Sequence, residues 1–349
     1  MSVDPVAATC PVPRAETERV LLGHGSGGQL MAELIDEVIT DELGTQGPLE
    51  DAAVVGVADL DLVFSTDGYV VTPRFFPGGD IGSLAVHGTV NDLAMRGARP
   101  VALSLAYIVE EGLPIDELRR ITRSVAKAAA EAGVQVVTGD TKVVGRGAAD
   151  GIYVTTTGIG VRLEGAYPSA AAAVPGDVVL VSGPIAVHGM AILNARADLG
   201  FDSGITSDSR PLHRLVAAMI EAGGSAVHSL RDPTRGGLAS ALNELAAASG
   251  VGVDIVEKDL PVPARVAAAC ELLGLDPLHV AGEGCLVAFV APESADGVLA
   301  AMRNLPEGVD ACRIGAVTDA PIGRVLARTL IGSRRIVDML VGEQLPRIC

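Results

Sequence analysis

Two spacings of apolar residues alternate along the chain, and together they predict a series of helices and strands. Spacings of three and four residues predict amphipathic helices, as in residues 26–43, where Leu30, Leu34 and Val38 share one face. Short apolar runs bounded by glycine, proline or aspartate predict strands. The predicted helices are 26–43, 80–96, 114–132, 188–199, 209–223, 234–249, 263–273 and 293–304. The predicted strands are 60–71 (with a turn at 66–68), 101–110, 134–140, 151–163, 177–183, 226–232, 251–257, 284–292, 312–318 and 322–329.

A stretch of alanine, proline and glycine that follows neither spacing, residues 164–177, divides the pattern into two halves. Domain boundaries fall in such segments, because few contacts cross them. We therefore expect an α/β protein with an N-terminal domain at 19–165 and a C-terminal domain at 172–337. Residues 1–18 are expected to form a disordered extension, and residues 338–349, which lack a partner element in the pattern, a mobile tail.

Composition narrows the class of protein. The apolar runs are of strand length, too short for a membrane span, and the N-terminus lacks the apolar core of a secretory signal. The net charge of -17 argues against a nucleic-acid partner, which needs a basic surface. Five cysteines without metal-ligand spacing predict reduced thiols in the cytoplasm and no structural zinc site.

Two glycine-rich segments precede predicted helices and are candidates for phosphate binding. Residues 23–29, GHGSGGQ, and residues 231–238, RDPTRGGL, each combine glycine with a helix N-terminus, where free N–H groups attract anions. The first segment is not a Walker A loop, because no Gly-Lys-Ser/Thr follows it. A flexible helix cap explains each segment about as well as phosphate binding does.

Four aspartates of the N-terminal half lie at the edges of apolar elements: Asp51, Asp67, Asp92 and Asp140. Taken singly, each is better explained as a turn former or a helix cap. Together they supply the oxygen ligands that Mg²⁺ uses when it bridges nucleotide phosphates. Lys142 follows Asp140 by two residues and is either a phosphate-binding or acid–base group, or a solvated loop lysine.

Glu283 and Cys349 stand out by their positions in the chain. Glu283 lies between two glycines at the start of a predicted strand, so it is either a turn residue or a catalytic carboxylate. Cys349 is the last residue, which rules out prenylation because that modification needs three residues after the cysteine. Three histidines, His188, His213 and His228, lack ligand spacing and are predicted to be ordinary surface or core residues.

These segments together resemble the ATP-binding superfamily of aminoimidazole ribonucleotide synthetase, selenophosphate synthetase and thiamine-monophosphate kinase, and within it the HypE family of hydrogenase maturation factors. The resemblance covers nearly all of residues 20–349 and rests on GHGSGGQLMAELI, LEDAAVV, VVTGDTKVV, RDPTRGGLASALNELA, AGEGC and, most specifically, PGGDIGSLAVHGTVNDLAMRGARP and the terminal PRIC. It implies a two-domain fold of the aminoimidazole ribonucleotide synthetase type. The N-terminal strands of two protomers would form one barrel, with ATP and Mg²⁺ in a cleft near the domain and dimer interfaces.

The resemblance also implies a reaction and its partners. The carbamoyltransferase HypF would place a carbamoyl group on the C-terminal thiol, and ATP would drive its dehydration to a thiocyanate. The cyanide would then pass to iron on a HypC–HypD complex during assembly of nickel–iron hydrogenase.

By the same resemblance, each matching residue of this chain receives an expected role. The catalytic residues would be Cys349, Lys142, Glu283 and His279. The ATP-binding residues would be Gly27, Gly28, Asp67, Asn91, Asp140, Thr141, Arg235 and Gly236. The magnesium ligands would be Asp51, Asp67, Asp92, Asp140 and Asp232. Lys142 and Glu283 would flank the carboxamide as cation and general base, and these two roles are interchangeable at this point.

Rival functions make different demands on the same residues. A selenophosphate synthetase usually carries a cysteine or selenocysteine in its N-terminal glycine-rich loop, and residues 23–29 hold neither. A thiamine-monophosphate kinase or ribonucleotide synthetase needs no terminal thiol. An ATP-binding scaffold without catalysis needs neither Lys142 nor Glu283. Because half a barrel leaves exposed strand edges, we also expect a homodimer.

Overall fold

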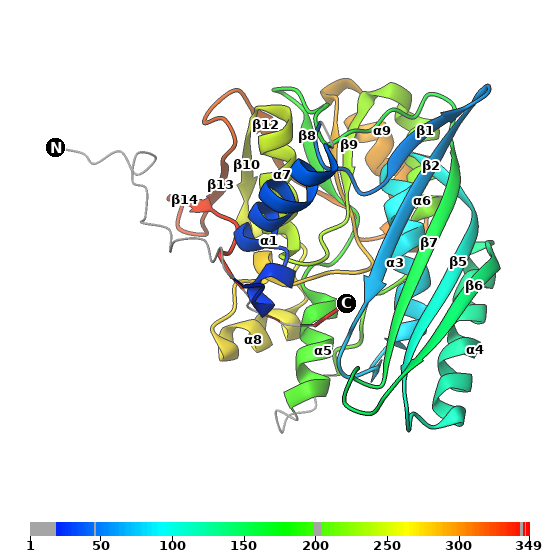
Figure 1. The fold of residues 1–349 in the computed structure, drawn as a ribbon. Coiled ribbons are helices and arrows are strands. Elements are labelled where there is room, and N and C mark those ends of the chain that lie inside the picture. Colours follow the sequence, from blue (N-terminus) through cyan, green and yellow to red (C-terminus); the bar gives the residue numbers. More distant parts are fainter. Residues whose placement is uncertain (1–18, 45–46, 198–203, 343–344, 346) are drawn as a thin grey trace.

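The structure, a computed structural model, describes residues 19–44, 47–197, 204–342, 345 and 347–349. It contains two large sheets with helices packed against them and a two-stranded sheet of β3 (Phe75–Phe76) and β4 (Gly79–Asp80). Helices α3 (Ile81–Met95) and α6 (His213–Gly223) contact each other between the large sheets (Figure 1). The predicted α/β fold class is confirmed. The predicted extension 1–18 and the end of the helix predicted at 188–199 lie outside the described residues.

The N-terminal sheet has the strand order β1-β2-β7-β5-β6 and is open in the single chain. Its strands are β1 (Ala53–Val57), β2 (Leu60–Tyr69), β7 (Ile152–Arg162), β5 (Ala98–Glu110) and β6 (Gln135–Val144). Neighbouring strands are antiparallel except β5 and β6. Helix α3 packs on the sheet and α4 (Ile115–Ala132) packs on α3. On β2, Val63 faces this core whereas the next residue, Phe64, is exposed on the opposite face.

The C-terminal sheet has seven strands in the order β14-β13-β10-β12-β8-β11-β9. They are β14 (Arg334–Val337), β13 (Val325–Arg328), β10 (Gly252–Val256), β12 (Cys312–Thr318), β8 (Val178–Val181), β11 (Val287–Val290) and β9 (Val227–Arg231). The central strand β8 is buried on both faces: Val179 packs with Leu242 of α7 (Gly237–Ser249), and Leu180 packs with Leu215 of α6. Helix α9 (Pro292–Arg303) shares the α6 side, and α5 (Val187–Ala197) packs with α8 (Ala264–Leu273).

Two local predictions differ from the structure. The turn predicted at 66–68 is wrong, because these residues lie inside β2 and pair with residues 155–157 of β7, so the neighbouring strand satisfies their backbone. The helix predicted at 26–43 is a helical run that starts at Gln29. It consists of α1 (Gln29–Leu34), a π-helix (Ile35–Thr40) and α2 (Asp41–Leu43). The π-helical turn rotates the apolar stripe, and Val38 and Ile39 are exposed.

The described part of the predicted tail is docked on the rest of the chain in this structure. Leu340 accepts a hydrogen bond from the backbone N–H of Gln29, at the start of α1. The last two residues, Ile348 and Cys349, are buried in a cluster that includes Tyr69 of β2. The C-terminus therefore lies between the N-terminal sheet and helix α5 (Figure 1). Movement of this tail stays a prediction.

Candidate functional site

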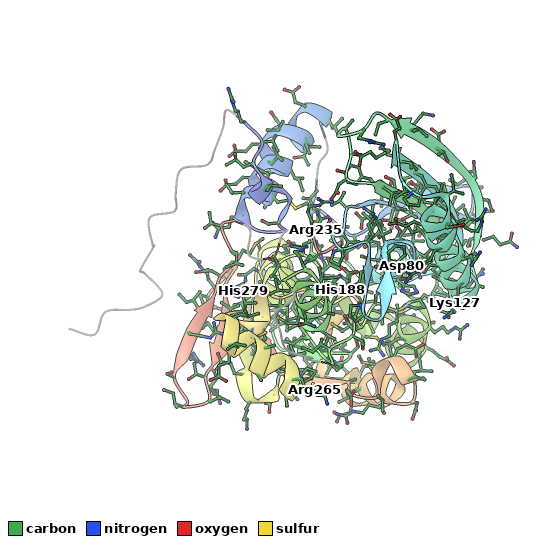
Figure 2. The ribbon with its side chains drawn as sticks, turned by 90° about the horizontal axis from the view of Figure 1, so that it is seen from below. Asp80, Lys127, His188, Arg235, Arg265 and His279 are labelled. Carbon is green, nitrogen blue, oxygen red and sulfur yellow. The ribbon has the colours of Figure 1, made fainter. Side chains whose placement is uncertain are left out.

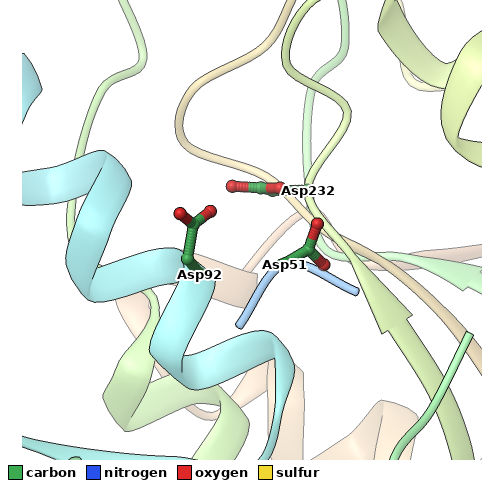
Figure 3. Close-up of side chains that lie close together, drawn as sticks. All are labelled: Asp51, Asp92 and Asp232. Atoms are coloured by element: carbon green, nitrogen blue, oxygen red, sulfur yellow. The ribbon is translucent and has the colours of Figure 1, made fainter. Parts of the chain in front are cut away.

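Three aspartates from both halves of the chain converge where the two sheets meet. Asp51 precedes β1, Asp92 lies on α3, and Asp232 follows β9. Each offers a carboxylate oxygen, and these oxygens lie within 4.8 Å of one another (Figure 3). The position of Asp92 depends on the start of α3, where the Asp80 carboxylate caps the helix by accepting the N–H groups of Gly82 and Ser83.

The electrostatics of this aspartate cluster favour a bound cation. Burial, together with the neighbouring carboxylates, raises the pKa of Asp51 to about 6, that of Asp232 to about 8 and that of Asp92 well above its ordinary value. Arg231 opposes this shift at Asp51, with its Nε 3.0 Å from the Asp51 Oδ1. Such an all-oxygen set fits a hard divalent cation of the Mg²⁺ type, because the ion would replace the protons that the buried carboxylates otherwise hold.

Asp67 belongs to the same electrostatic environment, whereas Asp140 does not. The Asp67 charge raises the pKa values of Asp92, Asp232 and Glu283, which places it beside the cluster. Asp140 has its pKa lowered by Lys142 and by the N–H of Thr141, its own neighbours on β6. The structure thus brings three of the five predicted magnesium ligands within 4.8 Å of one another, has Asp67 close enough for its charge to act on them, and separates Asp140.

Glu283 is a buried carboxyl group at the margin of the cluster. It is 3% exposed, and its Oε1 has no hydrogen-bond partner among the described residues. Burial first, and then the charges of Asp232 and Asp208, raise its pKa well above the ordinary value, while Arg235 opposes them. Its backbone is fixed by the Asp208 carboxylate, which accepts the N–H groups of Glu283 and Gly284. The turn-residue interpretation of Glu283 does not fit this burial.

The terminal thiol lies in the same environment. Cys349 is 9% exposed, and burial raises its pKa to about 12, with Glu283, Asp67 and Asp232 adding to the shift and Arg235 opposing it. The thiol is therefore protonated at neutral pH in this docked position. Arg235 supplies positive charge beside this thiol, because it is the group that lowers the pKa of Cys349.

The two glycine-rich segments pack against each other. A side chain at Gly27, which has a φ of +75°, would collide with the backbone of Arg235, and one at Gly236 would collide with the carbonyl of Gly27. The Ser240 hydroxyl donates to the same Gly27 carbonyl at 2.9 Å. These glycines are thus required for contact between α7 and the loop before α1. The Gly28 position is closed by the backbone of Leu340 in the docked tail.

Two other predicted site residues, Asn91 and His279, form hydrogen bonds with backbone groups. The Asn91 side chain is buried, and it accepts the N–H of Leu212 at 2.8 Å while donating to the carbonyl of Arg210. The His279 Nε2 donates to the carbonyl of Asp338 at 2.9 Å. His279 lies to one side of His188 and Arg235 in the view from below (Figure 2). Through its hydrogen bond to Asp338, His279 contacts the start of the tail.

Asp140, Thr141 and Lys142 lie on β6, the exposed edge of the N-terminal sheet. Strands β7 and β5 stand between β6 and β2, which carries Asp67. The Lys142 side chain is 68% exposed, and its Nζ lies 2.6 Å from the Asp140 Oδ2. A single chain therefore does not bring Lys142 to Glu283 and Cys349.

Several polar residues at the tail carry no recognisable signal in the sequence. His188 is buried, and its Nε2 lies 2.6 Å from the carbonyl oxygen of Ile348. The Arg196 guanidinium donates to the carbonyls of Thr72 and Arg347. Contacts between residues so distant in the chain depend on the tertiary fold, so no local pattern reveals them.

Comparison with known proteins extends the similarity over nearly the whole chain. Residues 49–162 match the N-terminal domain of AIR synthase related proteins, and residues 174–328 match the C-terminal domain. The chain is 53% identical to carbamoyl dehydratase HypE of Bradyrhizobium diazoefficiens over 330 residues, which are 94% of this chain and 95% of that protein. The chain belongs to the HypE family. It is also 44% identical to carbamoyl dehydratase HypE of Escherichia coli, over 95% of this chain and 99% of that one.

Solved structures of the HypE family share the fold. A crystal structure of a HypE–HypF complex superposes with a TM-score of 0.84 at 47% identity, covering 88% of this chain and 99% of that one. A crystal structure of HypE in complex with ATP superposes with a TM-score of 0.80 at 47% identity, covering 95% and 100%. A thiamine monophosphate kinase from Aquifex aeolicus, 19% identical, has a TM-score of 0.65 and covers 89% of this chain and 99% of that one, which shows a shared fold alone. The predicted membership of the HypE family is confirmed.

Proposed function

We propose that this chain is an ATP-dependent carbamoyl dehydratase whose substrate is an S-carbamoyl group on its own Cys349. The observation that carries the proposal is the position of the terminal thiol, buried beside Glu283 and Arg235 and next to the aspartate cluster. The names of the HypE relatives support the same activity. A carbamoyl group on this thiol would lie close to these charged side chains.

The nucleotide and cation follow from the acidic residues. A HypE relative has been solved in complex with ATP, and phosphates of a nucleotide need a cation beside carboxylates. Asp51, Asp92 and Asp232, with Asp67 beside them, would hold Mg²⁺. When bound, this ion neutralises the phosphates and stabilises the charge that develops during phosphoryl transfer. Gly27, Gly28, Asn91 and Gly236 would shape the ATP site around them.

The proposed reaction removes one water from the carbamoyl group in two steps. The carbamoyl oxygen attacks the γ-phosphorus of ATP, a new O–P bond forms, ADP leaves, and one N–H proton is lost. The C–O bond to the phosphate then breaks while the second N–H proton is removed, which leaves S–C≡N and inorganic phosphate. Phosphorylation is necessary because an amide oxygen is otherwise a very poor leaving group.

Arg235 and Glu283 have complementary roles in these steps. Arg235 would stabilise the anionic phosphoryl oxygens, since its guanidinium is always charged. Glu283 would accept an N–H proton, because a carboxylate of raised pKa is a stronger base once it has lost its own proton. Arg235 favours that ionised form of Glu283. His279 would act on the tail that carries the substrate, through the carbonyl of Asp338.

A homodimer would complete the site. The outer face of the N-terminal sheet exposes apolar side chains, and β1 and β6 are open strand edges. The exposed apolar residues on β1, β2 and β6 include Val55, Val57, Phe64, Val137 and Val143. A second protomer that covers this face would bury them, and its β6 would bring Asp140, Thr141 and Lys142 to the phosphates. Lys142 would then be the second cation at the carboxamide.

The burial of the docked thiol also bears on how the tail would reach its partner proteins. A protonated thiol that is 9% exposed cannot reach another enzyme, so the tail would leave the cleft to receive its carbamoyl group from HypF and to deliver cyanide to HypC–HypD. A HypE relative has been solved in complex with HypF. Within the described residues, no helix is long and apolar enough to cross a membrane. The four cysteines described are free thiols, in keeping with a cytoplasmic reaction.

Mass spectrometry of the C-terminal peptide tests the proposal. The chain is incubated with HypF, carbamoyl phosphate and ATP, and the mass of the peptide that contains Cys349 is followed over time. We expect a carbamoyl adduct that then loses one water only when ATP is present. A small-molecule kinase would instead leave Cys349 unmodified, and a scaffold would hold the adduct without losing water.

A further inference from the structure

A buried histidine on α5, His188, contacts the C-terminal segment of the chain. We propose that His188 is a positioning residue that latches the C-terminal segment in the cleft, by donating a hydrogen bond to the carbonyl of Ile348. The inference rests on the proposed function in one respect, because the latch matters for catalysis if Cys349 carries the substrate. Its structural content is independent of that reaction.

The geometry around His188 joins three segments. The ring is fully buried, and its Nε2 lies 2.6 Å from the carbonyl oxygen of Ile348, the residue before the terminal cysteine. Its Nδ1 lies 2.7 Å from the Ser207 Oγ. The Phe76 ring meets the imidazole edge to face, with centroids 5.4 Å apart. In Figure 2, His188 lies near the middle of the molecule, below Arg235.

The hydrogen bonds of His188 can run in one direction only. A carbonyl oxygen can only accept, so Nε2 carries the proton and donates it to Ile348. Burial lowers the pKa of His188, so the ring is neutral and its Nδ1 accepts from the Ser207 hydroxyl. The Ser207 Oγ in turn accepts the backbone N–H of Ser209 at 3.1 Å. Ser207 therefore fixes the tautomer that can hold the tail.

Each of the last three residues of the chain has its own donor for a backbone oxygen. The Arg347 carbonyl accepts from the backbone N–H of Thr72 and from Arg196, and the terminal carboxylate of Cys349 accepts from the N–H of Val70. The Ile348 carbonyl accepts from His188. Among the described contacts His188 is the one donor for Ile348, so its loss would leave a buried carbonyl unpaired whenever the tail is docked. We expect the docked population to fall by about ten- to hundredfold relative to the released one.

The segment that orients His188 also holds Glu283. Asp208 follows Ser207, and its carboxylate accepts the N–H groups of Glu283 and Gly284. The latch and the proposed base are therefore set by adjacent residues. This arrangement gives the docked thiol and Glu283 a common support, the segment of Ser207 and Asp208, although Glu283 and Cys349 lie far apart in the sequence.

The chain provides a matched control for this latch. His87 on α3 is also buried, and its Nδ1 lies 3.0 Å from the Ser209 Oγ, in the same segment as Ser207. Within the described residues, the hydrogen bonds of His87 do not include the tail. Replacing His87 therefore removes an equivalent buried imidazole–serine pair without removing a donor to Ile348.

Alkylation of Cys349 by iodoacetamide tests the latch on the full chain without ATP or any carbamoyl donor. The rate is followed by mass spectrometry of the C-terminal peptide, with Cys312, which is half-buried, as the internal reference. We expect His188→Leu to raise the Cys349 rate about ten- to hundredfold while the Cys312 rate stays constant. His188→Gln, whose amide N–H can reach toward Ile348, should restore most of the protection. His87→Leu should leave the Cys349 rate at the wild-type value.

Equal Cys349 rates in the wild type and His188→Leu would overturn the proposal, as would an equal rise in His87→Leu. If His188→Leu unfolds, the buried Cys270 and Cys285 become reactive as well, and Ser207→Ala then decides the matter. That variant should raise the Cys349 rate by a smaller factor, and no rise would refute the latch. Because the assay involves no dehydration, a failed latch and a failed reaction are distinguished.

Discussion

The cleft beside Cys349 and the outer edge at β6 hold the same kinds of residue in opposite surroundings. In the cleft, Asp51, Asp92, Asp232 and Glu283 are desolvated, and their pKa values are raised chiefly by burial. On β6, Asp140 is exposed and has its pKa lowered by Lys142. The cleft is thus built by the fold of one chain, whereas the polar residues of β6 project from an uncovered sheet edge.

This difference indicates that the site is shared between two protomers. An exposed Lys–Asp pair contributes little to stability, so its presence on β6 is not explained by folding. Buried carboxylates without an ion destabilise the fold, so the cleft is not explained by folding either. Both sets are explained if the cleft is one half of a site and β6 of a second protomer supplies the other half.

Removing the terminal thiol should have the largest effect. Cys349→Ala should abolish both carbamoyl loading and thiocyanate formation, because no atom remains to carry the substrate. ATP binding should persist, since the aspartate cluster is untouched. The matched control is Cys312→Ala, which should form thiocyanate at the wild-type rate. The measurement is mass spectrometry of the C-terminal peptide, and thiocyanate formation in Cys349→Ala preparations would contradict the account.

Neutralising Glu283 should separate catalysis from stability. We expect Glu283→Gln to slow dehydration by about a hundred- to ten-thousandfold, the range for loss of a general base. The midpoint temperature of thermal unfolding should change little or rise, because a neutral amide replaces a buried carboxyl group whose Oε1 has no hydrogen-bond partner among the described residues. Glu293→Gln, at an exposed position of α9, is the control. A fully active Glu283→Gln variant would remove Glu283 from the mechanism.

Mixed dimers test whether β6 acts across the interface. Lys142→Ala and Glu283→Gln should each be nearly inactive alone. When the two variants are mixed and exchange subunits, half of the dimers contain one protomer of each variant. In such a dimer one of the two sites combines an intact Lys142 with an intact Glu283, so about a quarter of the wild-type activity should return. Activity that fails to return would mean that Lys142 and Glu283 act within one chain.

Raising the pH should release the tail, with the smallest effect of the series. Burial raises the pKa of docked Cys349 to about 12, so the docked state holds its proton more tightly than the released tail does. The equilibrium constant for docking of the tail is therefore constant below the pKa of a free thiol. Above that pKa it falls about tenfold per pH unit, until the pKa of the docked thiol is reached. The methyl NMR signal of isotopically labelled Ile348 should report this release.

Cys349→Ser is the control for the pH experiment, because its hydroxyl does not titrate in this range. Its Ile348 signal should keep the docked position at every pH at which the fold is intact. A signal that moves equally in both proteins would show that the thiol does not govern docking.

Much of the fold could be predicted from the sequence, because local patterns determine it. The spacing of apolar residues identified α4 between Pro114 and Gly133, and the apolar run at β8 predicted a strand, which the structure shows to be buried. The turn predicted at 66–68 failed because Asp67 and Gly68 are typical turn residues, and their pairing with β7 outweighs that preference. Local chemistry cannot reveal which distant strand will compete for a segment.

The candidate site could be predicted in its chemistry but not in its geometry. The residue types pointed to carboxylates, glycine-rich segments and a terminal thiol, and the resemblance gave them roles. The tertiary fold brings the carboxylates of Asp51, Asp92 and Asp232 together, and the strand order places Asp140 on the edge strand β6. The contact between His188 and Ile348 spans 160 residues of sequence, so only the docked tail reveals it.

The most direct test of the central claim follows the carbamoyl oxygen itself. Cys349 is loaded with a carbamoyl group that carries a heavy oxygen isotope, ATP is added, and the phosphate that is released is analysed by mass spectrometry. If ATP phosphorylates the carbamoyl oxygen before the C–O bond breaks, the heavy oxygen will appear in the inorganic phosphate, one atom for each thiocyanate formed. Heavy oxygen that appears in water instead, with unlabelled phosphate, would contradict the account.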